Sequence, residues 1–310
     1  MRNSFARTLQ QLAAEDERVY LLIADVGFGV FEPFAEAFPK RYINVGVAEA
    51  NLASVAAGLA MEGKLPFIYS IANFPTFRCL EQVRNDICYH KANVKIVSVG
   101  GGLAYGTLGA THHATQDLAI MRALPEMVVV APADPVETEL AVRAAHLTVG
   151  PVYLRLNRAG DPILHTKVPD FAFGKANTLR EGADVALIAC GGIVSNVMDA
   201  AKALNEQGIT ARVVSMHTLK PLDTHAIAAA AREIGRVVTI EEHSLIGGLG
   251  SAVAEAMLEL GAPRARLRKL ALPDAFPSLV GSQEYLRDQH GLSCRGIVAA
   301  VTDFLAEPSD

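Results

Sequence analysis

The sequence predicts an α/β protein made of two consecutive domains. Short apolar runs of strand length alternate with segments of helical spacing, a pattern typical of parallel sheets covered by helices on both faces. Around residues 160–170, Pro162 and Pro169 mark a linker, after which the alternation begins again. A length of 310 residues suits two domains. We therefore expect a first domain at 1–165 and a second, smaller α/β domain at 166–310.

The elements follow in order from the apolar periodicity. The first domain is expected to contain strands at 19–24, 42–45, 65–69, 94–99, 127–131 and 151–156, with helices at 4–14, 31–38, 49–61, 74–90, 115–123 and 135–147. The second is expected to contain strands at 185–189, 211–215, 237–241 and 266–272, with helices at 193–207, 224–234, 250–260 and 297–305.

Composition excludes several classes of protein. The net charge is −5 and no long charge run occurs, so the sequence carries no nucleic-acid footprint. No apolar run approaches the ~20 residues that a membrane span needs, and the first residues lack the apolar segment of a signal peptide. The four cysteines show no metal-ligand spacing and suit reduced thiols. We expect a cytoplasmic protein without membrane or nucleic-acid partners.

Glu49 is the first candidate for a functional group. It begins a helix of mostly small residues, ANLASVAAGLAM, which should pack closely on several sides and be buried. An isolated charge there is costly unless it has a partner. Two interpretations stay open at this point: Glu49 complements the helix N-terminus, or it exchanges a proton with a ligand.

Two further signals lie where strands end. Asp25 follows the first strand, at the edge where ligand contacts gather in parallel sheets. The segment 100–113, GGGLAYGTLGATHH, is glycine-rich, which permits tight turns and close approach of the backbone to a ligand. It is not a P-loop, because no Gly-Lys-Ser/Thr follows.

Longer motifs, in order along the chain, resemble the pyrimidine-binding domain of transketolases. They are VGVAEANLASVAAGLA, FRCLEQVRNDICYHKANVKIV, GATHHATQDLAIMRALPEMVVVAPADPVETELAV and PVYLRL. The second domain fits the family through GITARVVSMHTLKPLD, VVTIEEHSLIGGLGSAV and the stretch around Gly291. The resemblance therefore implies a thiamine-diphosphate-binding domain followed by the transketolase C-terminal domain.

The resemblance assigns Glu49 a chemical role. The matching glutamate hydrogen-bonds N1′ of the aminopyrimidine ring and favours the imino tautomer, whose 4′-nitrogen removes the proton from the thiazolium C2. Phe74 matches an aromatic residue that packs on this ring, or it is ordinary core. Ile71 stands where a second aromatic residue is common, and Phe77 could supply that contact. Asp25 is counted with these cofactor-binding residues because of its place at a strand end.

Substrate contacts follow from the same resemblance. His112 matches the histidine of a Thr-His-Gln motif that lines the substrate channel, and His113 replaces the glutamine. Arg158 matches an arginine that holds a sugar phosphate; the alternative is a salt bridge with Asp161. Arg2 is a weaker match for a second phosphate-binding arginine. The FRCLEQVR motif adds Arg78 as a substrate contact and Arg84, for which a structural ion pair is the preferred interpretation.

Two positions depart from the family pattern. Transketolases usually carry a histidine where Gly100 stands and an aspartate where Leu108 stands, and both contact substrate hydroxyl groups. Without these polar groups, recognition of a hydroxylated donor should be altered. We expect a related ketol or acyl transfer, with a less hydroxylated donor such as pyruvate or with a different sugar.

The other half of a full-length transketolase is missing, because no GDG…N metal motif occurs. The chain thus resembles the C-terminal subunit of a split, thiamine-diphosphate-dependent enzyme that transfers a two-carbon ketol or acyl unit from a ketose or 2-oxo donor to an aldehyde or ketone. Mg²⁺ ligands are then expected on a separate diphosphate-binding subunit, in an α2β2 assembly that self-associates through both domains. The alternatives are the beta subunit of a 2-oxo-acid dehydrogenase decarboxylase component, a 1-deoxyxylulose-phosphate synthase and a non-catalytic scaffold.

Overall fold

A seven-stranded sheet organises the first half of the chain. The computed structural model describes residues 1–158, 160–261 and 265–308. The sheet has the order β10-β5-β6-β4-β3-β1-β2. All neighbouring strands pair in parallel except β10, which runs antiparallel to β5. The strands are β1 (Val19–Ile23), β2 (Tyr42–Asn44), β3 (Leu65–Ile71), β4 (Lys95–Val99), β5 (Val128–Val130), β6 (Val152–Leu156) and β10 (Thr218–Lys220).

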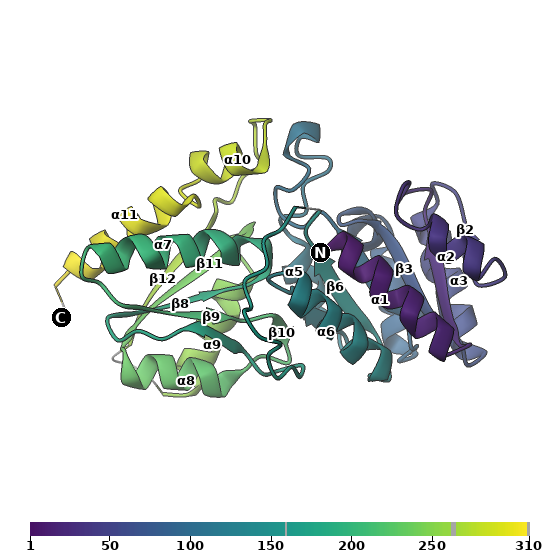
Figure 1. Ribbon diagram of the computed structural model, residues 1–310, viewed down its shortest axis with the longest axis horizontal. Helices are drawn as coiled ribbons and strands as arrows, with labels where there is room; N and C mark the ends of the chain where they lie inside the picture. Colours follow the sequence, from purple (N-terminus) through teal and green to yellow (C-terminus); the bar gives the residue numbers. More distant parts are fainter. Residues whose placement is uncertain (159, 262–264, 309–310) are drawn as a thin grey trace.

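Helices cover both faces of this sheet, as expected for parallel strands that are apolar on both sides (Figure 1). On one face Phe5 of α1 stacks against Tyr69 of β3, with ring centroids 5.9 Å apart. On the other face the small residues of α3, among them Ala53 and Ala56, are fully buried. The helices are α1 (Arg2–Glu15), α2 (Glu32–Ala37), α3 (Glu49–Met61), α5 (Asp117–Ala123) and α6 (Pro135–Leu147).

The second half of the chain forms a smaller sheet with the order β12-β11-β8-β9-β7. In Figure 1, α7 and α11 lie on one side of this sheet, and α8 and α9 lie on the other. The strands are β7 (Asn177–Arg180), β8 (Val185–Ala189), β9 (Ala211–Ser215), β11 (Arg236–Ser244) and β12 (Arg266–Leu272). The helices are α7 (Val194–Glu206), α8 (Thr224–Glu233), α9 (Leu249–Glu259), α10 (Gln283–Gln289) and α11 (Cys294–Ala306).

The predicted α/β class is confirmed, but several elements differ from expectation. The short strands β7 and β10 and the short helix α10 were missed. Both missed strands pair antiparallel, so neither sheet is wholly parallel. The continuous helix expected at 74–90 is wrong: it breaks at Cys79 into a π-helical turn η1 (Phe74–Arg78), α4 (Leu80–Gln82) and a second π-helical segment η2 (Val83–Tyr89). Widened turns of this kind are frequent at functional sites.

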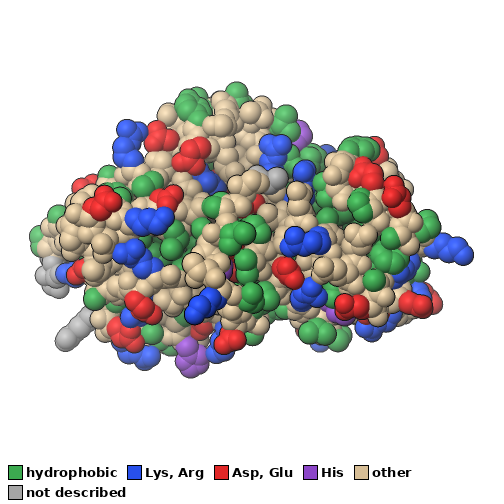
Figure 2. All heavy atoms as spheres, in the orientation of Figure 1, with side chains coloured by type: hydrophobic (Ala, Val, Ile, Leu, Met, Phe, Trp, Pro, Cys, Tyr) green, Lys and Arg blue, Asp and Glu red, His purple; other side chains and the backbone are tan. Residues whose placement is uncertain are grey.

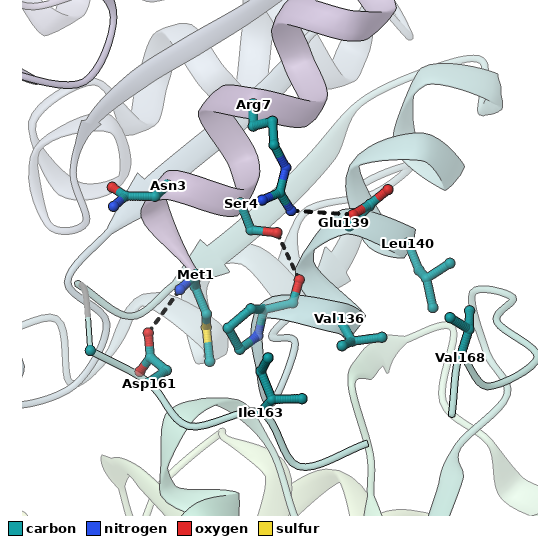
Figure 3. A pocket seen from close by; sticks show the side chains of 12 residues that line it. Met1, Asn3, Ser4, Arg7, Val136, Glu139, Leu140, Asp161, Ile163 and Val168 are labelled. Carbon is teal, nitrogen blue, oxygen red and sulfur yellow. Dashed lines mark hydrogen bonds and ion pairs between the residues drawn. The ribbon is translucent and has the colours of Figure 1, made fainter. Parts of the chain in front are cut away.

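The predicted linker crosses the first domain in an extended path and is held there by polar contacts. The Asp134 carboxylate caps α6 and accepts hydrogen bonds from the backbone N–H groups of Leu164 and His165, at 2.8 and 3.3 Å. Nearby, Asp161 binds the amino group of Met1 at 2.9 Å (Figure 3). A cavity of about 430 Å³ lies between the linker, α1 and α6, and none of the predicted site residues lines it (Figure 3).

The surface carries charges of both signs. On the face shown in Figure 2, acidic and basic side chains are scattered over both halves of the molecule. No helix in the part of the chain that the structure describes has both the length and the apolar character needed to cross a membrane.

His217 generates a prediction about acid stability. It is fully buried where the chain passes from β9 to β10, stacked on Phe171 at 4.2 Å between ring centroids. Burial lowers the pKa of His217 to about 4, below the ~6.5 of an unfolded chain. The unfolded state therefore binds the proton more readily, and stability is lost as the pH falls from about 6.5 towards 4.

The variant His217→Phe keeps an aromatic ring on Phe171 but cannot take up a proton. Urea unfolding at pH 7 and pH 4 should show a smaller acid-induced loss of unfolding free energy than in the wild type, by up to about 3 kcal/mol. His225→Phe, at an exposed site on α8, is the control and should leave the loss unchanged. An equal loss in wild type and His217→Phe would contradict the prediction.

Candidate functional site

The candidate residues gather at the carboxyl edge of the first sheet. Asp25 follows β1, Gly100 follows β4 and Arg158 follows β6. Phe74 begins the π-helical turn that comes after β3. Because parallel strands end at one edge, residues far apart in sequence come together there.

Glu49 is a deeply buried acidic group of this edge. It is the first residue of α3 and 1 % exposed. Its Oε2 accepts a 2.7 Å hydrogen bond from Nη1 of Arg78, and the Ser70 hydroxyl lies 3.4 Å from its Oε1. A buried carboxylate needs such a partner. Glu49 therefore does more than complement the helix N-terminus: it is the buried end of a specific ion pair.

Aromatic rings continue from this ion pair. The Arg78 guanidinium carbon lies 4.3 Å from the ring centroid of Phe74. On Phe74 the His112 ring packs edge-on, with centroids 5.4 Å apart and an interplanar angle of 68°. Arg78, expected at the substrate, thus lies against the two residues expected at the cofactor. Carboxylate, guanidinium, phenyl ring and imidazole form one continuous set.

A cavity of about 470 Å³ opens beside this set. Phe77, which the sequence assigned to the cofactor, lines it together with Phe74 and Arg78. Sequence reasoning missed three lining residues: Asn73, Gln116 and Phe276. Gln116 lies within a quoted family motif and Asn73 precedes Phe74, which could have drawn attention to them, whereas Phe276 comes from the second domain and carries no sequence signal. The lining comprises Asn73, Phe74, Phe77, Arg78, Ala110, Thr111, His113, Gln116 and Phe276.

Two buried residues of this cavity, His113 and Asn73, carry polar atoms that have no hydrogen-bond partner among the described residues. His113 is 2 % exposed, and neither of its ring nitrogens has a hydrogen-bond partner among the described residues. Burial lowers the pKa of His113, so the ring is neutral at pH 7. Asn73 donates to the carbonyl oxygen of Thr111, while its Oδ1 likewise has no partner within the described chain. Unpaired buried polar groups are costly and call for an explanation, such as a ligand.

A second cavity, of about 450 Å³, lies along the same edge. Arg158 and Arg2 line it, and the backbone N–H of Arg2 donates to the Arg158 carbonyl oxygen at 3.2 Å. The alternative pairing of Arg158 with Asp161 does not occur, because Asp161 binds Met1 and the Asn157 amide instead. Arg84, the second arginine of the FRCLEQVR motif, donates a hydrogen bond to the side chain of its neighbour Asn85 at 2.7 Å.

Other predicted residues line neither cavity. Asp25 is exposed at the end of β1 and accepts a 2.9 Å hydrogen bond from the Asn44 amide. Ile71 ends β3 and is half-buried. Leu108 is 51 % exposed, with its backbone in a short 3₁₀ turn. Gly100 is covered by a side chain of the same segment, the Tyr105 ring.

The glycines that begin the segment 100–113 allow close approach, but of the protein's own side chains. A Cβ at Gly101 would lie 2.6 Å from the Arg155 Nε, and one at Gly102 would lie 2.6 Å from the Cβ of Glu242. The expectation that these glycines admit a ligand to the backbone is therefore replaced by internal packing.

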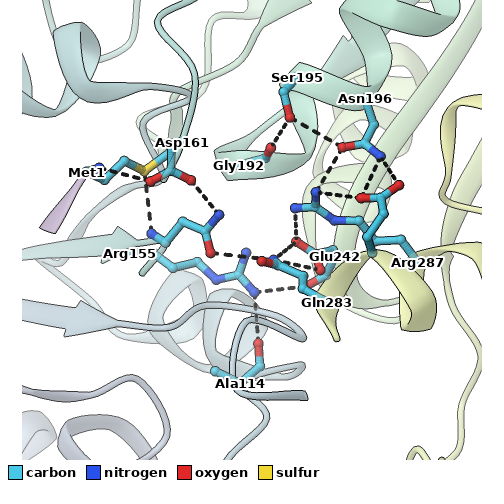
Figure 4. A network of polar contacts seen from close by, with 12 residues as sticks. Met1, Ala114, Arg155, Asp161, Gly192, Ser195, Asn196, Glu242, Gln283 and Arg287 are labelled. Atoms are coloured by element: carbon cyan, nitrogen blue, oxygen red, sulfur yellow. Dashed lines mark hydrogen bonds and ion pairs between the residues drawn. The ribbon is translucent and has the colours of Figure 1, made fainter. Parts of the chain in front are cut away.

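A buried network holds this segment against the second domain (Figure 4). Arg155 of β6 donates to the Asp117 carboxylate at 2.9 Å, and to the carbonyl oxygens of Ala114 and Glu242 at 2.8 and 2.9 Å. The Glu242 carboxylate accepts hydrogen bonds from Arg287 and Gln283, each at 2.9 Å. The loop that carries His112 and His113 is thus fixed to both domains.

The edge offers groups suited to an aminopyrimidine ring: the Glu49 carboxylate, the Phe74 ring and the orphaned polar atoms of Asn73 and His113. For a metal ion, the described residues do not supply such a set. Among the described residues, no group of three or more histidine, cysteine, aspartate or glutamate side chains lies close enough together to hold one.

The Glu49–Arg78 pair predicts an asymmetry in stability. Arg78→Gln leaves a carboxylate that is 1 % exposed without its cation, whereas Glu49→Gln leaves a guanidinium that is 47 % exposed and can turn to water. Urea unfolding of the chain at pH 7 should show Arg78→Gln destabilised by about 1–3 kcal/mol and Glu49→Gln by less. Arg7→Gln, in an exposed ion pair with Glu139, is the control. A larger loss in Glu49→Gln would contradict the asymmetry.

Known proteins share this two-domain architecture. Residues 1–160 match the transketolase pyrimidine-binding domain, and residues 174–297 match the transketolase C-terminal domain. A subunit of the apulose-4-phosphate transketolase from Phocaeicola vulgatus is 39 % identical, covering 98 % of this chain and 97 % of that protein. A 6-deoxy-6-sulfo-D-fructose transketolase subunit from a Clostridium species is also 39 % identical, over 97 % of this chain and 92 % of its own length.

Solved structures agree. A split gene transketolase, described as an inactive beta4 tetramer, superposes with a TM-score of 0.90 at 42 % identity, covering 98 % of this chain and 97 % of that chain. A transketolase from Campylobacter jejuni, 21 % identical, shares the fold with a TM-score of 0.80 over 97 % of this chain and 46 % of its own. The chain belongs to the transketolase family, and it is similar over nearly its whole length to subunits of split transketolases.

Proposed function

We propose that this chain is the pyrimidine-binding subunit of a split, thiamine-diphosphate-dependent transketolase-like enzyme. The enzyme would transfer a two-carbon ketol or acyl unit from a ketose or 2-oxo donor to an aldehyde or ketone acceptor. One observation carries the proposal: the buried Glu49 carboxylate is paired with Arg78, whose guanidinium lies on the Phe74 ring, and Arg78 and Phe74 line a cavity of about 470 Å³.

Glu49 and Phe74 would hold the aminopyrimidine ring. When bound, thiamine diphosphate supplies a carbon nucleophile and an electron sink for the carbanion left by C–C cleavage. The Glu49 carboxylate would hold a proton at N1′ of the ring, and Phe74 would pack on the ring face, with Phe77 at the cavity wall. Arg78 holds the Glu49 carboxylate in the structure, so its guanidinium would have to move aside for N1′ to reach that oxygen.

The polar groups across the cavity would contact the substrate. His112 lies against the Phe74 ring, and His113 lines the cavity with both ring nitrogens lacking partners among the described residues. A neutral imidazole can donate from one nitrogen and accept at the other. The two histidines and the Asn73 amide would hydrogen-bond carbonyl and hydroxyl oxygens of the donor, and His112 could move a proton.

The second cavity would take an anionic end of the substrate. Arg158 and Arg2 both line it, and guanidinium groups suit phosphate and similar anions. Two relatives support this assignment, because their names give apulose-4-phosphate and 6-deoxy-6-sulfo-D-fructose as substrates. We therefore propose a short sugar or 2-oxo compound with a phosphate-like or sulfonate-like end.

The remaining parts of the site would come from a separate diphosphate-binding subunit, in an α2β2 assembly. The 1-deoxy-D-xylulose-5-phosphate synthase of Heliobacterium modesticaldum, 38 % identical, is about twice as long, and this chain covers 46 % of it. Mg²⁺ and the cofactor diphosphate would then bind the partner. We place the domains at 1–165 and 166–310 and the enzyme in the cytoplasm, where its four free cysteines stay reduced.

The direct test is cofactor binding by the assembled pair. The chain is co-expressed with a diphosphate-binding chain, to be sought in the adjacent reading frame, and thiamine diphosphate with Mg²⁺ is titrated calorimetrically into wild type and Glu49→Gln. Wild type should bind the cofactor and turn over a ketose or 2-oxo acid. Glu49→Gln should still bind it, but turnover should fall by about 10²–10⁴-fold, because the proton at N1′ is no longer held by a carboxylate.

Glu62→Gln, an exposed glutamate at the other end of α3, is the matched control and should behave as wild type. A pair that binds no cofactor, or a Glu49→Gln variant with unchanged turnover, would favour the non-catalytic scaffold. Turnover of a branched or aromatic 2-oxo acid, with an acyl-carrying lipoyl domain as acceptor, would favour the dehydrogenase alternative.

A further inference from the structure

Position 100 is a glycine, and the ring of Tyr105 fills the space that a side chain there would need. Gly100 has φ +88°, and a Cβ built on it would lie 2.1 and 2.2 Å from the Cε2 and Cδ2 atoms of Tyr105. A Cβ atom is essentially never found closer than 3.0 Å to a non-bonded heavy atom. The Tyr105 ring and any side chain at position 100 therefore exclude each other.

The backbone around Tyr105 is held from both sides. Tyr105 precedes the 3₁₀ turn Gly106–Leu108, and its carbonyl oxygen accepts a 2.8 Å hydrogen bond from the Leu108 N–H. The Gly106 carbonyl oxygen accepts a hydrogen bond from the Gly281 N–H of the second domain at 3.2 Å. A Cβ at Gly106 would lie 2.5 Å from the Gly281 oxygen, so this close contact needs a glycine.

The Tyr105 ring also supports a cation. The guanidinium carbon of Arg158 lies 4.8 Å from the ring centroid, within the range of a cation–π contact. Arg158 and Arg2 line the cavity of about 450 Å³, as do Ala104 and Gly106, the two neighbours of Tyr105. Burial raises the pKa of Tyr105, so the phenol is neutral at pH 7 and its ring is an uncharged platform for the guanidinium.

We propose that Tyr105 fills the space of a side chain at position 100 and is a positioning residue for Arg158. In this exchange of side chains, an aromatic ring from the loop occupies the space that a side chain rooted on the sheet edge would otherwise take. Arg158, packed on that ring, would bind the anionic end of the substrate. The ring would place carbon atoms, rather than polar atoms, beside the neighbouring part of the substrate. The site would then favour substrates that carry an anionic group on a carbon chain with few hydroxyl groups.

The inference that Tyr105 fills the space at position 100 rests on the packing alone. The inference about the end group of the substrate rests on the proposed function. Two experiments separate these parts. The first measures urea unfolding midpoints of Gly100→Ala in the wild-type and Tyr105→Ala backgrounds. Gly63→Ala is the control, because Gly63 has φ +76° and a Cβ there would meet nothing within 4 Å.

Gly100→Ala should lower the midpoint more than Gly63→Ala in the wild type, because it adds a clash to the backbone strain. In the Tyr105→Ala background, the further shift caused by Gly100→Ala should shrink to that of Gly63→Ala, because the ring has gone. The same shift in both backgrounds would overturn the exchange of side chains.

The second experiment titrates inorganic phosphate calorimetrically into the assembled pair. Tyr105→Phe keeps the ring and should bind phosphate within twofold of wild type, whereas Tyr105→Leu should bind it at least fivefold more weakly. Tyr89→Leu, at a residue 82 % exposed, is the control for loss of a tyrosine and should match wild type. Arg158→Gln should abolish the binding.

Equal phosphate affinity in Tyr105→Phe and Tyr105→Leu would overturn the positioning role, and so would phosphate binding that is insensitive to Arg158→Gln or absent from wild type. Failure of the pair to bind thiamine diphosphate would instead defeat the proposed function. The unfolding midpoints would still decide whether Tyr105 fills the space at position 100.

Discussion

The arrangement of the site depends on one buried guanidinium. Arg155 is 5 % exposed, and its N–H groups reach the Asp117 carboxylate at the start of α5, the Ala114 carbonyl oxygen in the loop and the Glu242 carbonyl oxygen in β11. A buried cation without partners would be costly, so these three acceptors must stay in place while the protein is folded. Because they belong to the loop, the first domain and the second domain, Arg155 ties all three together.

Residues of the second domain also lie at the site. Phe276 lines the cavity next to Phe74, and Gly281 hydrogen-bonds the turn that follows Tyr105. Glu242 links β11 to α10 through Arg287 and Gln283. The second domain therefore completes the walls of both cavities at the sheet edge.

What the sequence predicted well was local. Apolar runs marked the parallel strands, and the small residues after Glu49 indicated a helix with a buried carboxylate at its start, because periodicity is a property of neighbouring residues. The expected burial on several sides is wrong in this chain, where Asn51, Ser54 and Gly58 of α3 are exposed. The Arg78 contact with Glu49, the pairing of β10 with β5 and the position of Phe276 depend on residues distant in sequence. Tyr105 was missed for the same reason: the space above Gly100 is visible only once the loop has folded back on itself.

The most direct test of the account is hydrogen–deuterium exchange on the assembled pair, with and without thiamine diphosphate and Mg²⁺. A cofactor ring held between Glu49 and Phe74 should slow amide exchange in the π-helical turn Phe74–Arg78 and in the loop at 109–113, because both segments line the cavity. The linker at 160–170, beside the cavity of about 430 Å³ between α1 and α6, should exchange at the same rate with and without the cofactor. Unchanged exchange at 74–78 in a pair shown by calorimetry to bind the cofactor would contradict the placement of the aminopyrimidine ring at Glu49.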